Sequence, residues 1–152
     1  QIVQDGDINR KLLAHKGWVR AMVHDSENGE LWTCAEDGIR VWHVPVLESI
    51  SESIAHMPKT KGGEVLSLEL VDNTVWAGCS DGTISVFDRA TKGRLATFHA
   101  YKNKPVSELE KVLDSVWAGG HKGEITIWST KPPYKASGKL MLPQGTVTCM
   151  TE

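Results

Sequence analysis

The first residues that could carry out chemistry are a hydroxyl, an imidazole and a carboxylate, at Thr33, His15 and Asp37. In hydrolases, such a set removes the hydroxyl proton and turns the oxygen into a nucleophile. Here the equivalent positions recur later in the chain as residues without that chemistry: Ala77, Ala118 and Lys122. A catalytic set is needed only once, whereas a set that braces a fold recurs with each structural unit. We therefore predict a structural hydrogen-bond network and no enzyme activity.

Two glycine-rich stretches, 61–63 and 119–123, contain the lysine and glycines of a phosphate cradle. Neither has the spacing of a P-loop, so we interpret both as turns. The histidines follow no metal-ligand spacing, and the three cysteines form no Cys-x-x-Cys pair. The sequence therefore predicts no metal and no cofactor. The cysteines are typical of a reduced, cytoplasmic protein.

Size and composition favour one globular domain. The chain has 152 residues, of which 40% are hydrophobic, and this is enough for a core. A formal charge of −2 argues against a nucleic-acid binder, which is usually basic. No apolar run is long enough to span a membrane, and the first residues do not resemble a signal peptide. Because the chain starts with Gln1 rather than methionine, we interpret it as a piece of a longer protein.

Three segments of the chain repeat one another in register: 31–42, 75–87 and 116–128. Their first tryptophans, Trp32, Trp76 and Trp117, are 44 and 41 residues apart, and a glycine follows each of them by six residues. That glycine supplies the positive φ of a hairpin turn. After it, β-branched residues alternate with polar ones, which is the period of a strand. Each segment therefore predicts two antiparallel strands joined by a tight turn.

Two further strands are expected upstream of each hairpin. The inner ones are expected at 19–23, 65–70 and 106–109, and the outer ones at 9–13, near 50–54 and at 94–98. Polar turns separate them, and no segment keeps a helical period. The predicted fold class is therefore all-β, with repeated units of four strands.

The three repeats share a histidine before the inner strand, a glycine turn and an aromatic residue that ends the third strand. In this they resemble WD40 repeats, whose hairpin turn carries Asp-Gly. The resemblance implies a bracing network at His15, Thr33, Asp37 and Trp42, at His56, Asp81 and Phe87, and at His99 and Trp128, with Lys122 in place of the aspartate. The Val-Trp-Ala-Gly strands are similar to propellers of larger signalling proteins, such as inositol polyphosphate 5-phosphatases and exchange factors for small GTPases.

The resemblance implies a partial β-propeller of about three four-stranded antiparallel WD40-like blades, with an unpaired strand at each end. The blades are expected at 18–55, 64–99 and 105–142. Residues 8–14 would be the outer strand of a preceding blade, and 145–151 the inner strand of a following one. Propellers usually close with four to eight blades. The remaining blades are therefore expected from the parent chain or from another copy.

A partner is expected on the face of the disc that carries the hairpin turns. By resemblance, the contact positions are Trp18, Arg20, Glu36, Glu64, Leu66, Ser80, Pro105, Ser107 and His121. Lysines that include Lys61, Lys104 and Lys122 surround this face, whereas acidic residues are expected on the opposite one: Asp25, Glu27, Glu30, Asp72 and Asp114. A basic rim favours an acidic or phosphorylated peptide or a phosphoinositide headgroup.

Three functions remain open at this point. The chain could be a protein-protein interaction scaffold within a larger cytoplasmic signalling or trafficking protein. It could be the accessory propeller of an enzyme, such as an inositol polyphosphate phosphatase or kinase. It could also be a self-assembling module that other copies complete.

Overall fold

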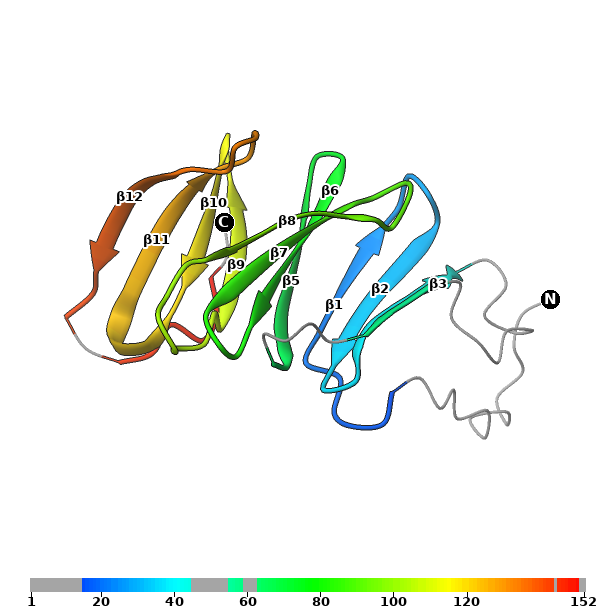
Figure 1. Ribbon diagram of the computed structural model, residues 1–152, viewed down its shortest axis with the longest axis horizontal. Coiled ribbons are helices and arrows are strands. Elements are labelled where there is room, and N and C mark those ends of the chain that lie inside the picture. The colour runs from blue at the N-terminus through cyan, green and yellow to red at the C-terminus, as the bar shows by residue number, and fades with distance from the viewer. Residues whose placement is uncertain (1–14, 45–54, 59–62, 144, 151–152) are drawn as a thin grey trace.

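The computed structural model describes residues 15–44, 55–58, 63–143 and 145–150, and within them it is built from β-strands (Figure 1). One short helical turn, η2 (His121–Gly123), interrupts them. The strands are β1 (Ala21–Asp25), β2 (Glu30–Ala35), β3 (Gly38–His43), β4 (Ala55–Pro58), β5 (Val65–Val71), β6 (Thr74–Cys79), β7 (Thr83–Asp88), β8 (Arg94–His99), β9 (Glu108–Val112), β10 (Ser115–Gly119), β11 (Glu124–Ser129) and β12 (Ala136–Met141).

These strands form three antiparallel sheets, and each sheet takes four strands that are consecutive in the chain. The orders are β1-β2-β3-β4, β5-β6-β7-β8 and β9-β10-β11-β12. The sheets lie side by side in chain order, with β5 between β1 and β9 (Figure 1). The predicted all-β class and the three four-stranded units are therefore confirmed.

The turn between the second and third strands of each sheet depends on glycine. Gly38, Gly82 and Gly123 have φ values of 120°, 91° and 72°. At Gly82 an added Cβ would also lie 2.2 Å from the carbonyl oxygen of Tyr101. The glycine that follows each tryptophan by six residues is thus required by the backbone.

Two hydrophobic cores hold the sheets together. The core between the first and second sheets contains Trp32 and Val75, and the core between the second and third contains Trp76 and Val116. Both tryptophans are fully buried, because each lies on the second strand of its sheet and faces the next sheet. The regular spacing of tryptophans therefore reflects a repeated contact between neighbouring sheets.

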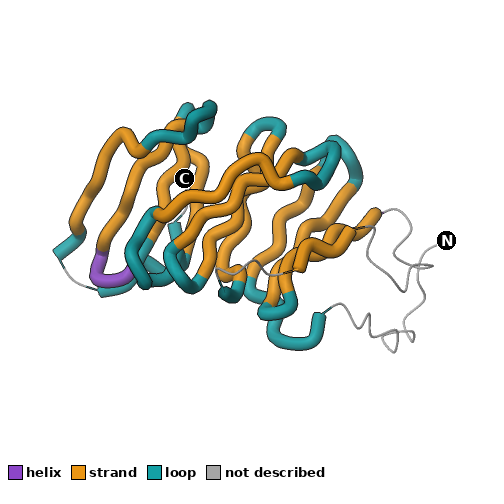
Figure 2. Tube along the Cα trace, in the orientation of Figure 1, coloured by secondary structure: helices purple, strands orange, loops and turns teal. Residues whose placement is uncertain are grey.

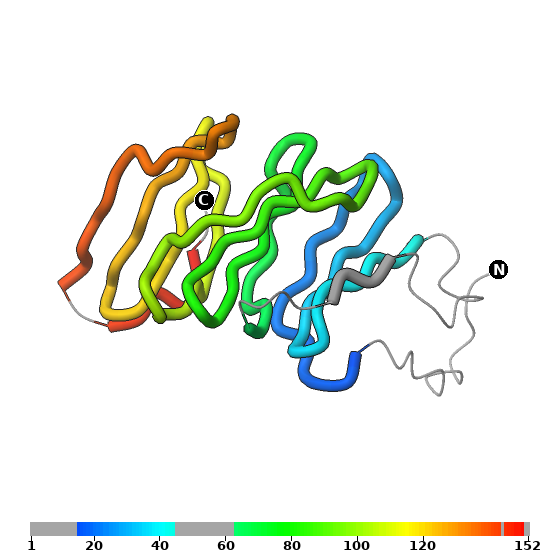
Figure 3. The backbone as a smooth tube through the Cα atoms, viewed as in Figure 1, coloured from blue at the N-terminus to red at the C-terminus, as the bar shows by residue number. Residues whose placement is uncertain are grey.

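A valine near the start of each inner strand fits against a small residue of the preceding sheet. Val106 lies against Gly78, where an added Cβ would be 2.6 Å from its Cγ1, and Val147 lies against Gly119 at the same distance. Val65 is buried in the first core at the equivalent place. Figure 3 shows the segment after β12 returning beneath the third sheet, where Val147 donates its N–H to Gly120.

Apolar residues are left uncovered at both ends of the row of sheets. Val19, which is equivalent to Val65, is 45% exposed, and Met22 beside it is also exposed. On the third sheet Trp117 is only partly buried, and Leu140 is exposed. A neighbouring sheet covers the equivalent positions elsewhere in the molecule.

Some predicted boundaries shift. The outer strand predicted near 50–54 and the strand predicted at 8–14 lie outside the described residues. The outer strand that the structure describes in the first sheet is β4, which continues past the predicted blade end at residue 55. Residues 145–150 form no strand, although Val147 occupies the place of an inner-strand valine. The predicted fourth-blade strand therefore remains a prediction.

Candidate functional site

The four residues predicted to brace the first sheet lie in one hydrogen-bonded chain. His15 Nδ1 lies 2.6 Å from Asp37 Oδ1, and His15 Nε2 lies 2.8 Å from Thr33 Oγ1. The Trp42 indole donates to the same Thr33 oxygen at 2.9 Å. With the ring proton donated to Asp37, the other ring nitrogen accepts the Thr33 hydroxyl proton. These hydrogen bonds connect the loop before β1 to β2, to the hairpin turn and to β3.

Burial favours a structural role for this set. The His15 side chain is only 1% exposed, and Thr33 is buried, so no substrate reaches the hydroxyl in this conformation. Burial alone would raise the pKa of Asp37, but hydrogen bonds from His15 and Arg40 outweigh it and lower that pKa. A carboxylate held in its charged form by two donors stabilises the turn that carries it.

Replacing Thr33 with valine is expected to lower the free energy of unfolding by about 1–2 kcal/mol, because the Trp42 N–H and a His15 nitrogen lose their partner in a buried place. Chemical denaturation measures the loss. Thr33→Ser keeps the hydroxyl and is the matched control. Equal stability of the valine and serine variants would contradict the role of the hydroxyl.

The other two sheets contain different contacts at the predicted network positions. Asp81 accepts hydrogen bonds from the N–H and hydroxyl of Thr83 in its own turn, at 3.0 and 2.7 Å. The Trp128 indole donates to Thr126 at 2.9 Å, and Phe87 is buried in the first core. Of the other predicted members, His99 lies exposed on β8. The backbone of His56 on β4 pairs with that of Arg40 on β3.

Tyr101 occupies in the third sheet the place that His15 takes in the first. Its buried hydroxyl donates to the Ala118 carbonyl at 2.5 Å and also lies 3.2 Å from the Glu124 carbonyl. Both residues come from the loop that enters their sheet, 17 and 16 residues before the repeated tryptophan. This spacing from the tryptophan is the sequence signal for Tyr101, whereas the WD40 resemblance points to His99.

The most exposed aromatic residue of the described chain lies at the start of the first inner strand. Trp18 is 80% exposed, and the Arg20 guanidinium lies 5.6 Å from the centre of its ring. Arg20 Nε in turn donates to Glu64 Oε1 of the second sheet at 2.7 Å. The structure thus brings three predicted contact residues together. Exposed Glu36 lies nearby on the hairpin turn, within 2.9 Å of a Cβ added at Gly17 next to Trp18.

The remaining predicted contact residues make other contacts. The Ser80 hydroxyl accepts the N–H of Glu64 at 3.1 Å, so it holds Glu64 in place. Leu66 and Ser107 are partly buried, and His121 lies 3.3 Å from the Thr146 hydroxyl. Lys122 is exposed, and Lys104 pairs with Glu124 in the third sheet. Lys61 lies outside the described residues.

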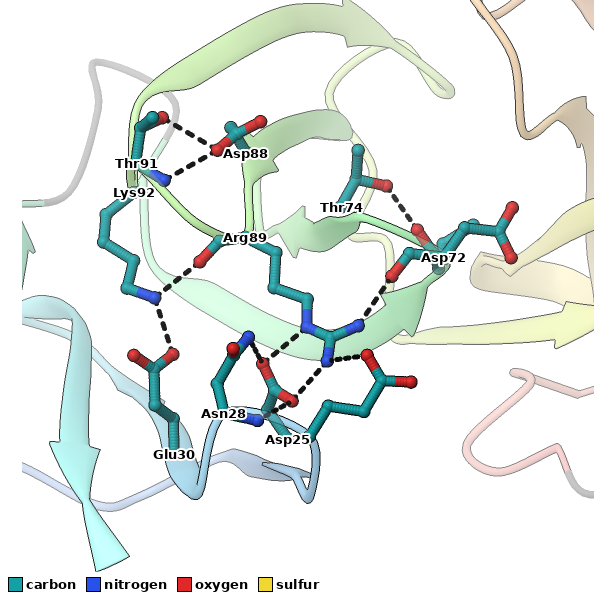
Figure 4. Close-up of polar contacts among 11 residues, drawn as sticks. Asp25, Asn28, Glu30, Asp72, Thr74, Asp88, Arg89, Thr91 and Lys92 are labelled. Carbon is teal, nitrogen blue, oxygen red and sulfur yellow. Dashed lines mark hydrogen bonds and ion pairs between the residues drawn. The ribbon is translucent and has the colours of Figure 1, made fainter.

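The opposite face is not the acidic surface expected from the sequence. Arg89, in the turn between β7 and β8, reaches across to the first sheet and pairs with both oxygens of Asp25 at 2.5 Å and with Glu27 at 2.7 Å (Figure 4). Lys92 from the same turn pairs with Glu30 at 2.6 Å. Basic side chains of the second sheet therefore pair with Asp25, Glu27 and Glu30, which are three of the five acidic residues expected on this face.

Asp25 is the centre of this ionic junction. Its side chain is fully buried and also accepts both an N–H and the amide of Asn28. Burial alone would raise the pKa of Asp25, but the hydrogen bonds from Arg89 and Asn28 outweigh it and lower the pKa to about 2. The junction is therefore charged at neutral pH.

Lys92 also explains an exception among the repeated tryptophans. The indoles of Trp76 and Trp117 donate to a hydroxyl two residues earlier. At that position the first sheet has Glu30, whose carboxylate is paired with Lys92, and the Trp32 N–H has no hydrogen-bond partner among the described residues. The Lys92 ammonium instead lies 5.1 Å from the centre of the Trp32 ring. The ionic junction therefore takes the place of a hydrogen bond found in the other two sheets.

Solved WD40 structures match this arrangement of sheets. The crystal structure of RRP9 WD40 repeats covers 89% of this chain with a TM-score of 0.74 and 17% identity. The chain has the WD40 propeller fold. The structure of U3-55K covers the same share with a TM-score of 0.74 and 16% identity, and that of Chaetomium thermophilum Raptor covers 81% with a TM-score of 0.68 and 17% identity.

At these identities the likeness shows the WD40 fold alone. The chain spans 42% of the RRP9 and U3-55K chains and 12% of the Raptor chain, which is less than half of each. No family model and no curated protein sequence matches it. Within the described ranges, no group of three or more metal-ligating side chains could hold an ion, and no helix could cross a membrane.

Proposed function

We propose that the chain is part of a protein-protein interaction scaffold and binds a protein partner through Trp18 on the face with the hairpin turns. The WD40 fold supports an interaction module. The observation that carries the specific proposal is the exposed Trp18 ring beside Arg20, which Glu64 anchors. We place the scaffold in a larger cytoplasmic signalling or trafficking protein, as the sequence resemblance implies.

The Trp18 surface has the properties of a binding hot spot. Tryptophan and arginine are enriched among the residues that dominate interface energies. The ion pair of Arg20 with Glu64 joins the first and second sheets, and the Ser80 hydroxyl fixes the backbone of Glu64. A ring supported in this way loses little conformational freedom on binding, and this favours affinity.

Replacing Trp18 with alanine is expected to weaken binding of the partner at least about tenfold, because hot-spot truncations commonly exceed that loss. Partners are found by proximity labelling with the intact parent protein, and their affinity is then measured with purified proteins. Leu95→Ala is the matched control, since Leu95 is exposed on the outer strand β8. A Trp18→Ala variant that binds every identified partner with unchanged affinity would remove the proposal.

The uncovered faces at the two ends of the row of sheets favour contact with further blades. Val19 and Met22 on the first sheet and Leu140 on the third are the positions that a neighbouring blade would cover. We propose that further blades complete the ring, from the parent chain or from another copy. Light scattering on the 152-residue chain tests completion by another copy.

A role as the accessory propeller of an inositol polyphosphate phosphatase or kinase rests only on the Val-Trp-Ala-Gly resemblance.

A further inference from the structure

One carboxylate of the third sheet is held between two lysines from different parts of the chain. Glu124 Oε1 lies 2.5 Å from Lys139 Nζ on β12, and Glu124 Oε2 lies 3.6 Å from Lys104 Nζ in the loop between the second and third sheets. The hydrogen bond from Lys139 lowers the pKa of Glu124. Two ammonium groups thus flank a position that suits an anion, and the Glu124 carboxylate occupies it.

Positive charge around this position exceeds the negative charge. Lys122 is exposed in η2, two residues before Glu124, and Lys102 is exposed two residues before Lys104. Figure 2 shows the turn that contains η2 directly before β11, the strand that begins with Glu124. Two lysines contact the carboxylate, and two further exposed lysines lie close to this pair in the sequence. This excess of lysines favours a ligand with more than one negative charge.

The strand that carries Lys139 has one side open for pairing. β12 is the outer strand of its sheet, and β11 is its only strand neighbour among the described residues. Its exposed side chains include Lys139 and Met141, which lie on the same face because they are two residues apart. An extended peptide can add to such an edge through its backbone, with alternate side chains directed to that face.

We propose that the edge of β12 binds an extended phosphorylated peptide of a protein partner, and that its phosphate displaces the Glu124 carboxylate from Lys139 and Lys104. A phosphate carries about −1.5 to −2 charges and three acceptor oxygens, so it competes with a single carboxylate for two lysines. A peptide carboxylate has no such advantage over Glu124. This inference rests on the proposed scaffold function but uses a surface separate from Trp18.

The probes are degenerate peptides with a central phosphoserine or phosphothreonine, compared with the same peptides carrying serine or glutamate. The 152-residue chain is titrated with each peptide while fluorescence anisotropy is recorded. Phosphopeptides are expected to bind at least about tenfold more tightly than the others. Lys104→Ala/Lys139→Ala should reduce that binding at least about tenfold, whereas Lys131→Ala, at an exposed lysine in the turn before β12, should not.

Glu124→Gln is the sharpest variant because it should strengthen binding. It removes the competing charge but keeps the backbone carbonyl that accepts bonds from Tyr101 and Gly120. The expected gain is about threefold, the scale of an exposed ion pair. Backbone amide signals of β12 should shift on titration. Weaker phosphopeptide binding by Glu124→Gln, or equal binding of all three peptides, would overturn the proposal.

Two further results separate this surface from other sites. Binding to vesicles with phosphoinositides, without binding to any phosphopeptide, would assign the lysines to a membrane and overturn the proposal. Trp18→Ala is expected to leave phosphopeptide affinity unchanged. A loss of phosphopeptide binding in Trp18→Ala equal to that in the double lysine variant would place the peptide at Trp18 and also overturn it.

Discussion

Replacing Arg89 with methionine is expected to lower the free energy of unfolding by about 3–5 kcal/mol, the cost of leaving a buried charge without its partner. Methionine keeps an unbranched apolar chain but cannot donate. Among the described residues, fully buried Asp25 would then retain only the hydrogen bonds from Asn28. Chemical denaturation at neutral pH measures the loss.

The matched control for Arg89 lies on the same face between the second and third sheets. Lys111 pairs with Asp72 at 2.8 Å, but the Lys111 side chain is 35% exposed and that of Asp72 is 60% exposed. Lys111→Met should therefore change stability by less than about 1 kcal/mol. Equal losses in the two variants would show that the burial of Asp25 is not what makes the Arg89 pair important.

The Asp25 junction also predicts how the chain responds to acid. The pKa of Asp25 is near 2 in the folded protein and near the usual value of 3.8 in the unfolded chain. Its stabilisation is therefore complete above the unfolded value and is lost as the pH falls from about 4 toward 2. The Arg89→Met variant should lack this part of the acid dependence.

Replacing Glu69 with glutamine is expected to stabilise the chain at pH 8 by up to about 3 kcal/mol and to have little effect near pH 4.5. Burial between β5 and β9 raises the pKa of Glu69 from 4.5 to about 7, with Glu110 and Glu108 adding to the effect. The folded protein thus holds a proton that the unfolded chain releases. Stability contributed by this group falls as the pH rises from about 4.5 through 7, and glutamine removes that fall.

Glutamine suits this position because it keeps an oxygen for the backbone N–H of Lys111, which lies 3.3 Å from Glu69 Oε1. Denaturation curves at pH 5 and pH 8 give the comparison. Asp114→Asn, on an exposed turn, is the control and should follow the original protein. Burial also raises the pKa of Glu108, so a smaller dependence of the same sign should remain. Parallel pH dependences for Glu69→Gln and the original protein would contradict the prediction.

Local sequence patterns predict most of the fold. The glycine that follows each tryptophan predicts the three hairpins, and the alternation of β-branched and polar residues after it predicts the third strands. Both signals are local, because turn geometry and strand period depend on neighbours in the chain. The set formed by His15, Thr33, Asp37 and Trp42 followed from the resemblance to WD40 repeats, and the structure brings these four residues into contact. The outer strand predicted near 50–54 lies outside the described residues, and β4 is described at Ala55–Pro58.

Local sequence patterns do not predict the contacts between sheets. Arg89 is 64 residues from Asp25, so no local pattern connects them, and five acidic residues in turns were interpreted as one acidic surface. The resemblance to WD40 repeats points to a histidine, His99, whereas the structure places the donor at Tyr101. No sequence pattern marks Lys139, because a lysine on an outer strand has no distinctive spacing.

The fit of valine against a small residue has a consequence for where this chain can be divided. Val65, Val106 and Val147 follow one another at intervals of 41 residues, and each packs on the sheet that precedes it in the chain. The boundary of a unit that keeps its packing therefore lies a few residues after the boundary between two sheets. A blade exchanged with another propeller would keep its packing only if it carried the first residues of its successor, and a shortened chain would do better to end after Met150 than after Leu142.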